Sequence, residues 1–240
     1  MISLLNQLKK DLKKIANPKK AKDCLWFFKT GKGQYGEGDK FLGVSVPEQR
    51  KVAKKYPDLD LSDLQKLLSS QIHEYRLTAL FILVGQYKKI KQDRNKKTIV
   101  DFYIKNAKRI NNWDLVDSSA HYIIGDYLLD KKDRKILYKL AKSKNLWEKR
   151  ISIISCFAFI RDNQYEDALK ISEILLHDEH DLIHKAVGWM LREVGNRDQE
   201  TEEKFLKKYH KTMPRTMLRY AVEKFKENKR QSYLSGVCFK

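Results

Sequence analysis

The sequence predicts an all-α protein built as a curved α-solenoid, with helix pairs stacked along the chain and a concave basic face. Apolar residues recur at spacings of three and four along most of its 240 residues. Only four prolines interrupt the chain, so long stretches contain no helix breaker. Similar segments recur about every 34 residues: Trp113 to Trp147 is 34, Arg150 to Lys185 is 35, and Lys185 to Arg219 is 34. This period is typical of two-helix repeats.

The first 45 residues are expected to hold two helices and a glycine-rich loop. Leu4, Leu5, Leu8, Leu12 and Ile15 fall on one helix face. After Asn17-Pro18, a second helix is predicted over residues 19–28. The glycine-rich loop covers residues 31–38, and an apolar extended segment follows over residues 41–46.

Residues 46–240 are expected to form the helical repeats, and residues 1–240 a single domain. Pro47 suits the first turn of a helix. Ser62 is predicted to N-cap a helix over residues 63–68. Several of the predicted helices begin with a polar or basic residue followed by an apolar stripe, and two such starts carry Arg76 and Arg219.

The charge balance of the chain indicates a polyanionic partner. Fifty Lys and Arg residues against 31 Asp and Glu residues give a formal net charge of +19. Nucleic acid is the simplest partner, because basic surfaces gain affinity by releasing counterions from phosphates. A proteome rich in lysine would give the same composition without any such partner. A membrane surface is disfavoured, since no isolated basic amphipathic anchor is present.

The cysteines and the chain start point to a cytoplasmic protein without disulfides. Cys24, Cys156 and Cys238 have neither zinc-site nor disulfide spacing. Cys24 and Cys156 lie among apolar residues and are expected to be buried thiols. The first twelve residues form an amphipathic, lysine-bearing pattern rather than a signal peptide. The longest apolar stretch, residues 79–84, is too short to span a bilayer.

The glycine-rich loop contains Gly31, Gly33 and Gly36 in the spacing G-x-G-x-x-G. A dinucleotide site would need a strand before this motif and a helix directly after it. An aromatic helix precedes the loop and an extended segment follows it. A loop whose backbone approaches a phosphate, or a flexible connection, fits this pattern better than a nucleotide site.

The segment 111–119 carries the strongest chemical signal. Trp113 and Asp117 are i and i+4 on a predicted helix and share one face, whereas Leu115 and Val116 are expected to point inward. The pair has two interpretations. In the first, Asp117 is an ordinary helix residue and Trp113 is a packing residue. In the second, they form an aromatic platform beside an anion in a concave site.

Two later segments place basic residues near a tryptophan. Arg150 follows Trp147 by three residues, and it either holds a phosphate or pairs with Asp117; Trp147 is expected in the core. Trp189 lies four residues after Lys185 and three before Arg192, which suits a nucleic-acid surface or a buried ring rimmed by charges. Gly188 within this predicted helix indicates a close approach of another helix or a ligand.

These segments together resemble the AlkD family of bacterial DNA alkylation repair glycosylases over nearly the whole chain. The matching segments are Asn17-Pro18, Phe41-Leu42-Gly43 with Pro47-Glu48 and Arg50, Trp113-Asp114-x-Val116-Asp117-Ser118, Trp147 with Arg150, and Lys185-Ala186-x-Gly188-Trp189-x-Leu191-Arg192-Glu193. The resemblance implies a curved stack of HEAT-like repeats. It also implies an active site of Trp113, Asp117, Arg150 and Trp189. It places Phe27 where the family has a tyrosine, with Trp26 one position away as the alternative.

The resemblance implies a glycosylase that removes cationic N7- or N3-alkylated purines from duplex DNA in base excision repair. It implies no metal, no redox cofactor, no membrane and no obligate protein partner. A monomer is expected, because a solenoid with polar terminal helices can cap itself. Phe27, Arg76, Lys185, Arg192 and Arg219 are the expected DNA contacts.

A scaffold that binds damaged or branched DNA without excision is the alternative, because Phe27 lacks a hydroxyl and the glycine-rich loop is longer than usual in the family. A protein-binding solenoid is a third possibility. Most glycosylases flip the target base, whereas the resemblance implies capture without a base-specific pocket; the sequence leaves both open.

Overall fold

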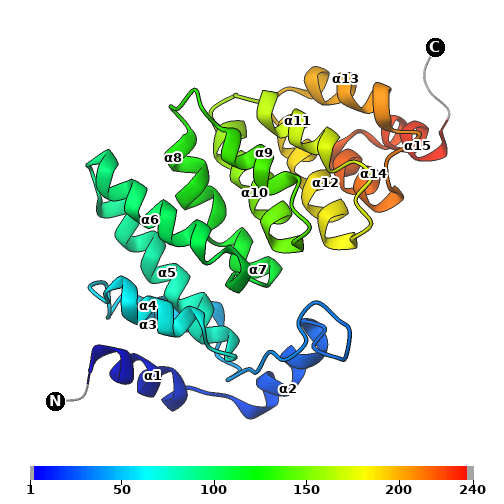
Figure 1. Ribbon diagram of the computed structural model, residues 1–240. Coiled ribbons are helices and arrows are strands. Elements are labelled where there is room, and N and C mark those ends of the chain that lie inside the picture. The colour runs from blue at the N-terminus through cyan, green and yellow to red at the C-terminus, as the bar shows by residue number, and fades with distance from the viewer. Residues whose placement is uncertain (1–2, 237–240) are drawn as a thin grey trace. The chain divides into compact units, whose positions relative to one another are not determined.

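Helices make up nearly all regular structure of the protein (Figure 1). The computed structural model describes residues 3–236. Within this range no strand forms, and the only strand-like pairing is an isolated parallel bridge between Lys40 and Ile72. The predicted all-α class is confirmed. The chain divides into two compact units, residues 1–119 (unit 1) and residues 120–240 (unit 2), so the boundary expected near residue 45 lies inside unit 1.

Unit 1 contains helices of very different length, which are α1 (Leu4–Lys14), α2 (Pro18–Phe27), α3 (Val46–Ala53), α4 (Leu61–Leu68), α5 (His73–Lys89), α6 (Asp93–Lys105), the 3-10 turn η1 (Ala107–Arg109) and α7 (Trp113–Asp117). The long central helix α5 is buried on most sides, and α3, α4, α6 and α7 all pack against it. The helix that begins at His73 therefore organises this unit.

The starts of the first helices follow from their cap residues. The Ser3 and Asn17 side chains accept the Asn6 and Lys20 amides at the starts of α1 and α2. Leu5, Leu8 and Leu12 are buried, as their spacing predicts, but Leu4 and Ile15 at the two ends of α1 are exposed. Pro47 lies in the first turn of α3, as predicted.

The start of α4 differs from the prediction. The helix begins two residues before the predicted start, and Asp60 rather than Ser62 is its N-cap. The Asp60 Oδ1 accepts the Asp63 amide at 2.7 Å. A carboxylate at a helix N-terminus also interacts favourably with the helix dipole.

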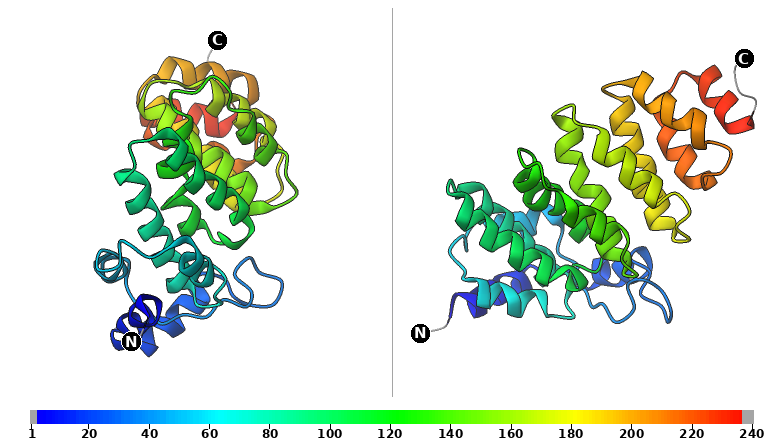
Figure 2. Two further views of the ribbon diagram at one scale, coloured as in Figure 1. Left: turned by 60° about the vertical axis from the view of Figure 1, so that its left-hand side comes forward. Right: turned by 45° about the horizontal axis from the view of Figure 1, so that its top comes forward.

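Unit 2 consists of helix pairs, which are formed by the π-helical turn η2 (His121–Gly125), α8 (Asp126–Leu128), α9 (Lys135–Ala141), α10 (Leu146–Arg161), α11 (Glu166–Ile174), α12 (Asp181–Gly195), α13 (Gln199–Tyr209), α14 (Arg215–Ala221), the 3-10 turn η3 (Val222–Lys224) and α15 (Glu227–Ser235). Helices α10, α12 and α14 pack on one another in turn, while α9, α11 and α13 cover them (Figures 1 and 2). Their starts at Leu146, Asp181 and Arg215 confirm the predicted repeat.

Gly188 of α12 lies where α14 approaches most closely. A Cβ atom at Gly188 would lie 2.4 Å from the Met217 carbonyl oxygen and 2.6 Å from the Tyr220 Cβ. The predicted close approach of another helix is therefore confirmed. Gly125 has the same role against α10, because its Cβ would lie 2.4 Å from the Ser155 carbonyl oxygen.

Neither cysteine of the described range forms a disulfide. Cys156 is buried as predicted, but Cys24 is only half-buried, because α2 has no fully buried residue. Across residues 3–236, no helix combines the length and apolar character needed to cross a membrane.

Candidate functional site

Helix α7 of unit 1 presents Trp113 and Asp117 as predicted. The Asn112 side chain accepts the Trp113 amide at 2.8 Å and caps the helix. Leu115 and Val116 are completely buried, which fixes the orientation of this five-residue helix. Trp113 and Asp117 are half-buried, one helical turn apart. A carboxylate and an indole ring therefore both reach the protein surface from one short helix.

An aromatic cluster joins the end of α2 to the start of α7. Phe28 stacks on Trp113 at 5.6 Å between ring centroids and on Phe41 at 5.1 Å. Phe27 meets Trp113 edge to face at 5.9 Å and remains 55% exposed. The neighbouring Trp26 is 84% exposed and forms no such contact with Trp113. Phe27, rather than Trp26, is thus the α2 residue that the structure brings to Trp113.

A buried charge network lies directly beneath this aromatic cluster. His73, 2% exposed, stacks against Phe28 and Phe41. Its Nε2 lies 2.8 Å from an Asp114 oxygen, and its Nδ1 lies 3.6 Å from an Asp39 oxygen. Burial alone would lower the pKa of His73, but the attraction and hydrogen bonding of Asp114, with a contribution from Asp39, raise it to about 9. The imidazole is therefore cationic at neutral pH and ties the start of α7 to α5.

Arg76 belongs to the same network. It is 3% exposed, and its guanidinium donates to Asp39 at 2.7 Å and to the Ser70 carbonyl oxygen at 2.9 Å. Despite the cost of burying the carboxylate, the hydrogen bond from His73 and the Arg76 charge hold the pKa of Asp39 below its usual value. The structure corrects the expectation that Arg76 contacts DNA, because its charge is used inside unit 1. Asp39 and His73 are the site residues that the sequence pattern did not indicate.

Glu74 fixes the extended segment that precedes α3. Its carboxylate accepts the backbone amides of Leu42, Gly43 and Val44, with the Gly43 bond at 2.7 Å. Gly43 has φ 75°, and a Cβ there would lie 2.2 Å from the Asn17 carbonyl oxygen. This arrangement holds Phe41 under Phe28 and connects the start of α2 to α5.

Unit 2 carries Arg150 and Trp189. Arg150 is 5% exposed and donates to the Leu182 carbonyl oxygen, whereas Trp147 is buried as predicted. Trp189 is half-buried, and its indole N–H donates to Glu193 at 2.9 Å. Phe157 of α10 lies 5.7 Å from the Trp189 ring. The orientation of Trp189 is thus determined by one hydrogen bond and one ring contact.

The predicted basic residues of unit 2 differ in their surroundings. Lys185 is half-buried and pairs with Asp181 at 2.7 Å. Arg192 is half-buried and pairs with Glu223. Arg219 is exposed. Arg219 is therefore the most accessible of these three cations for an external phosphate.

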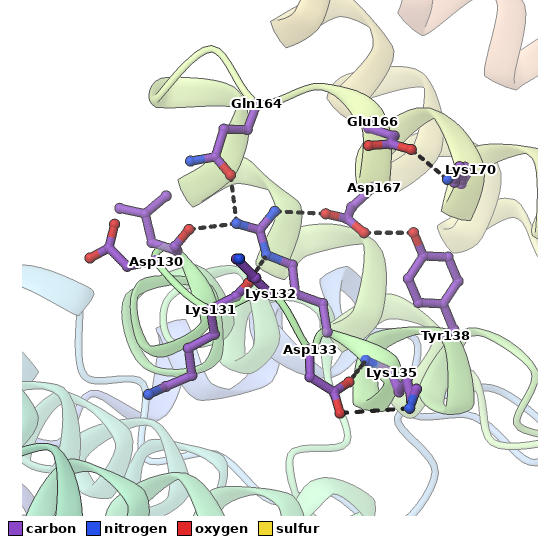
Figure 3. A pocket seen from close by; sticks show the side chains of 12 residues that line it. Asp130, Lys131, Lys132, Asp133, Lys135, Tyr138, Gln164, Glu166, Asp167 and Lys170 are labelled. Carbon is purple, nitrogen blue, oxygen red and sulfur yellow. Dashed lines mark hydrogen bonds and ion pairs between the residues drawn. The ribbon is translucent and has the colours of Figure 1, made fainter.

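Arg134 lines a separate polar pocket together with residues of α9 and α11, among them Tyr138 and Asp167, which face each other in Figure 3. Its guanidinium donates to Asp167 at 2.7 Å, to Gln164, and to the carbonyl oxygens that end α8, and it lies over the Phe159 ring. Tyr138 donates to the same Asp167. These bonds connect neighbouring helix pairs, so this cluster has a structural role. Residues 3–236 contain no group of three or more His, Cys, Asp or Glu side chains arranged to hold a metal ion.

The comparison with known families agrees with this fold. The sequence matches the family described as DNA alkylation repair enzyme over residues 8–225, nearly the whole chain. The chain belongs to this family. A solved structure described as a predicted DNA alkylation repair enzyme from Enterococcus faecalis matches this DNA alkylation repair protein with a TM-score of 0.67 and 15% identity. The match covers 88% of this chain and 97% of that chain, and at this identity it shows a shared fold. No curated protein matches by sequence. The family assignment confirms the predicted resemblance and places the protein in the repair of alkylated DNA.

Proposed function

We propose that this DNA alkylation repair protein is a glycosylase that hydrolyses the N-glycosidic bond of N7- or N3-alkylated purines in duplex DNA, the first step of base excision repair. The observation that carries this proposal is the half-buried carboxylate of Asp117, one turn from Trp113, whose ring is joined by the exposed Phe27. The net charge of +19 supports duplex DNA as the substrate.

The reaction places few demands on the protein. A purine alkylated at N7 or N3 carries a positive charge and is already a good leaving group, so no strong general acid is needed. The transition state then develops positive charge on the deoxyribose. A carboxylate about 4 Å from this charge contributes roughly 4 kcal/mol at an effective dielectric constant near 20. That stabilisation corresponds to about a thousandfold in rate.

We assign Asp117 to this electrostatic role and to orienting the attacking water. Trp113, Phe27 and Trp189 supply aromatic faces for the deoxyribose and the cationic nucleotide, which gain from cation–π attraction. Arg150 is assigned to a phosphate beside the lesion. Because Arg150 is only 5% exposed, this contact has to use the small exposed part of the residue. Lys185, Arg192 and Arg219 are assigned to the DNA backbone. No metal or redox cofactor enters this scheme.

The decisive experiment measures release of 7-methylguanine and 3-methyladenine from methylated duplex DNA. The Asp117→Asn variant should lose about a thousandfold in rate while it retains DNA binding. Asp101→Asn is the matched control, since Asp101 is an exposed carboxylate of α6 that pairs with Lys97; it should release bases at the wild-type rate.

DNA binding measured over a range of salt concentrations separates the alternatives. A glycosylase releases base and shows a linear fall of log affinity with log salt. Salt-dependent binding without release by the wild type would refute the glycosylase proposal and leave a DNA-binding scaffold. Binding that does not respond to salt would argue against a DNA interface altogether.

A further inference from the structure

Unit 1 contains a cavity that the proposed chemistry does not use. It lies between α5 and the end of α3 and has a volume of about 430 Å³. One face of α5 forms its floor, because Gly85 has Phe81 and Ile82 four and three residues before it and Lys88 and Lys89 three and four residues after it. The remaining wall consists of Arg50, Ala53, Lys54, Pro57 and Val84.

Gly85 has no packing reason to be a glycine. It lies inside the 17-residue helix α5, where glycine is less favourable than any other residue except proline. A Cβ added there would meet no atom within 4 Å. By contrast, the helical glycines Gly125, Gly188 and Gly195 each face an atom that a Cβ would strike. The absence of a side chain at Gly85 therefore keeps the cavity open rather than allowing a helix to approach.

The cavity combines an apolar floor with a rim of one charge sign. Phe81 is 8% exposed and Ile82 3%, and both contribute apolar surface to the floor. The Arg50 guanidinium lies over the Phe81 ring at 4.0 Å from its centroid, which holds one cation at the wall. Lys54, Lys88 and Lys89 add three more positive charges, and none of the ten lining residues is acidic.

We propose that this cavity binds a small organic anion with an apolar or aromatic body and a carboxylate, sulfonate or phosphate group. The volume lies within the range of small-molecule sites and is too small for a docked helix. The apolar part would lie on Phe81 and Ile82 beside Gly85, where it gains from the burial of apolar surface. The anionic group would be held by Arg50 and the lysines of the rim.

The test uses the full chain and the fluorescence of anilinonaphthalene sulfonate, an aromatic anion of this class. The wild-type protein should bind one equivalent with a fluorescence increase. Gly85→Ala, which adds one methyl group, should retain binding. Gly85→Leu fills the cavity with its own side chain and should abolish binding, while the melting temperature stays at or above that of the wild type. Equal binding by wild type and Gly85→Leu would refute the proposal.

A matched pair of double variants tests the rim. Lys54→Gln with Lys88→Gln removes two rim charges and should weaken binding about tenfold or more, a loss typical of charge-assisted hydrogen bonds. Lys51→Gln with Lys91→Gln removes two exposed lysines from the same region that do not line the cavity, and it should leave the affinity unchanged. Equal weakening by both pairs would show that the general positive charge attracts the dye, and the cavity would then not be its site.

Discussion

The buried imidazole of His73 should make the stability of the protein depend on pH in a defined direction. The perturbation is His73→Gln, which keeps a polar side chain but cannot carry a charge. His73 faces Asp114 and Asp39, and Arg76 is the other charged group of the network. The comparison of wild type with this variant cancels the titration of all groups that do not interact with His73.

The magnitude follows from the pKa of His73, which rises from 6.5 to about 9 on folding. The difference corresponds to about 3 kcal/mol of stability. Because the folded pKa is the higher one, this contribution is fully present below pH 6.5, where both states hold the proton. It decreases as the pH rises, since the unfolded chain releases the proton first, and it is lost above pH 9.

Urea unfolding at several pH values between 6 and 9 measures this effect. The stability advantage of wild type over His73→Gln should fall by about 3 kcal/mol across this interval. An independent NMR titration should show the His73 ring resonances changing near the upper end of the range. A stability difference that stays constant, together with a ring that titrates near pH 6.5, would mean that the folded protein holds a neutral His73 and would refute this reasoning.

Further variants test packing, burial and DNA contact. Gly188→Ala should lower the free energy of unfolding by about 1–3 kcal/mol because its Cβ meets a backbone carbonyl, whereas Gly85→Ala should raise it by about 0.5–1 kcal/mol; the same sign for both would contradict the steric argument. Burial and the nearby Glu203 charge raise the pKa of Glu202 from 4.5 to about 9, so its contribution to stability should fall as pH rises between these values, and Glu202→Gln should remove that part of the wild-type slope in urea titrations while the His73 part remains. Arg219→Gln should reduce the salt slope of DNA binding by about one if this exposed residue contacts a phosphate; an unchanged slope would remove it from the interface.

Local patterns in the sequence were sufficient for helices and for their buried faces. The spacing of Leu115 and Val116 against Trp113 and Asp117 correctly predicted which side of α7 is buried. The close contact predicted at Gly188 is present, because no other residue leaves that space, but Gly85 in α5 fits the same pattern and has no such contact. Helix starts were less certain, since good N-cap residues lie close together before α4.

Contacts between residues far apart in the chain could not be predicted, because no local sequence pattern marks them. Asp39, His73 and Asp114 come from three separate segments, and their ion pairs depend on how those segments pack. In the sequence, Arg76 resembles the other arginines at helix starts. In the structure it is buried and pairs with Asp39, a partner that no local pattern indicates. The half-buried state of Cys24 has a similar origin, because α2 covers little of the core.

The residues on both sides of the glycine-rich loop are held by contacts that do not involve the loop itself. Phe28 before the loop is held by its ring contacts, and Asp39 after it is held by Arg76 and His73. Glu74 secures the segment that follows through three backbone amides. Insertions or deletions between residues 31 and 37 should therefore leave the aromatic cluster in place. The loop is therefore a position where a peptide should be grafted with little loss of stability.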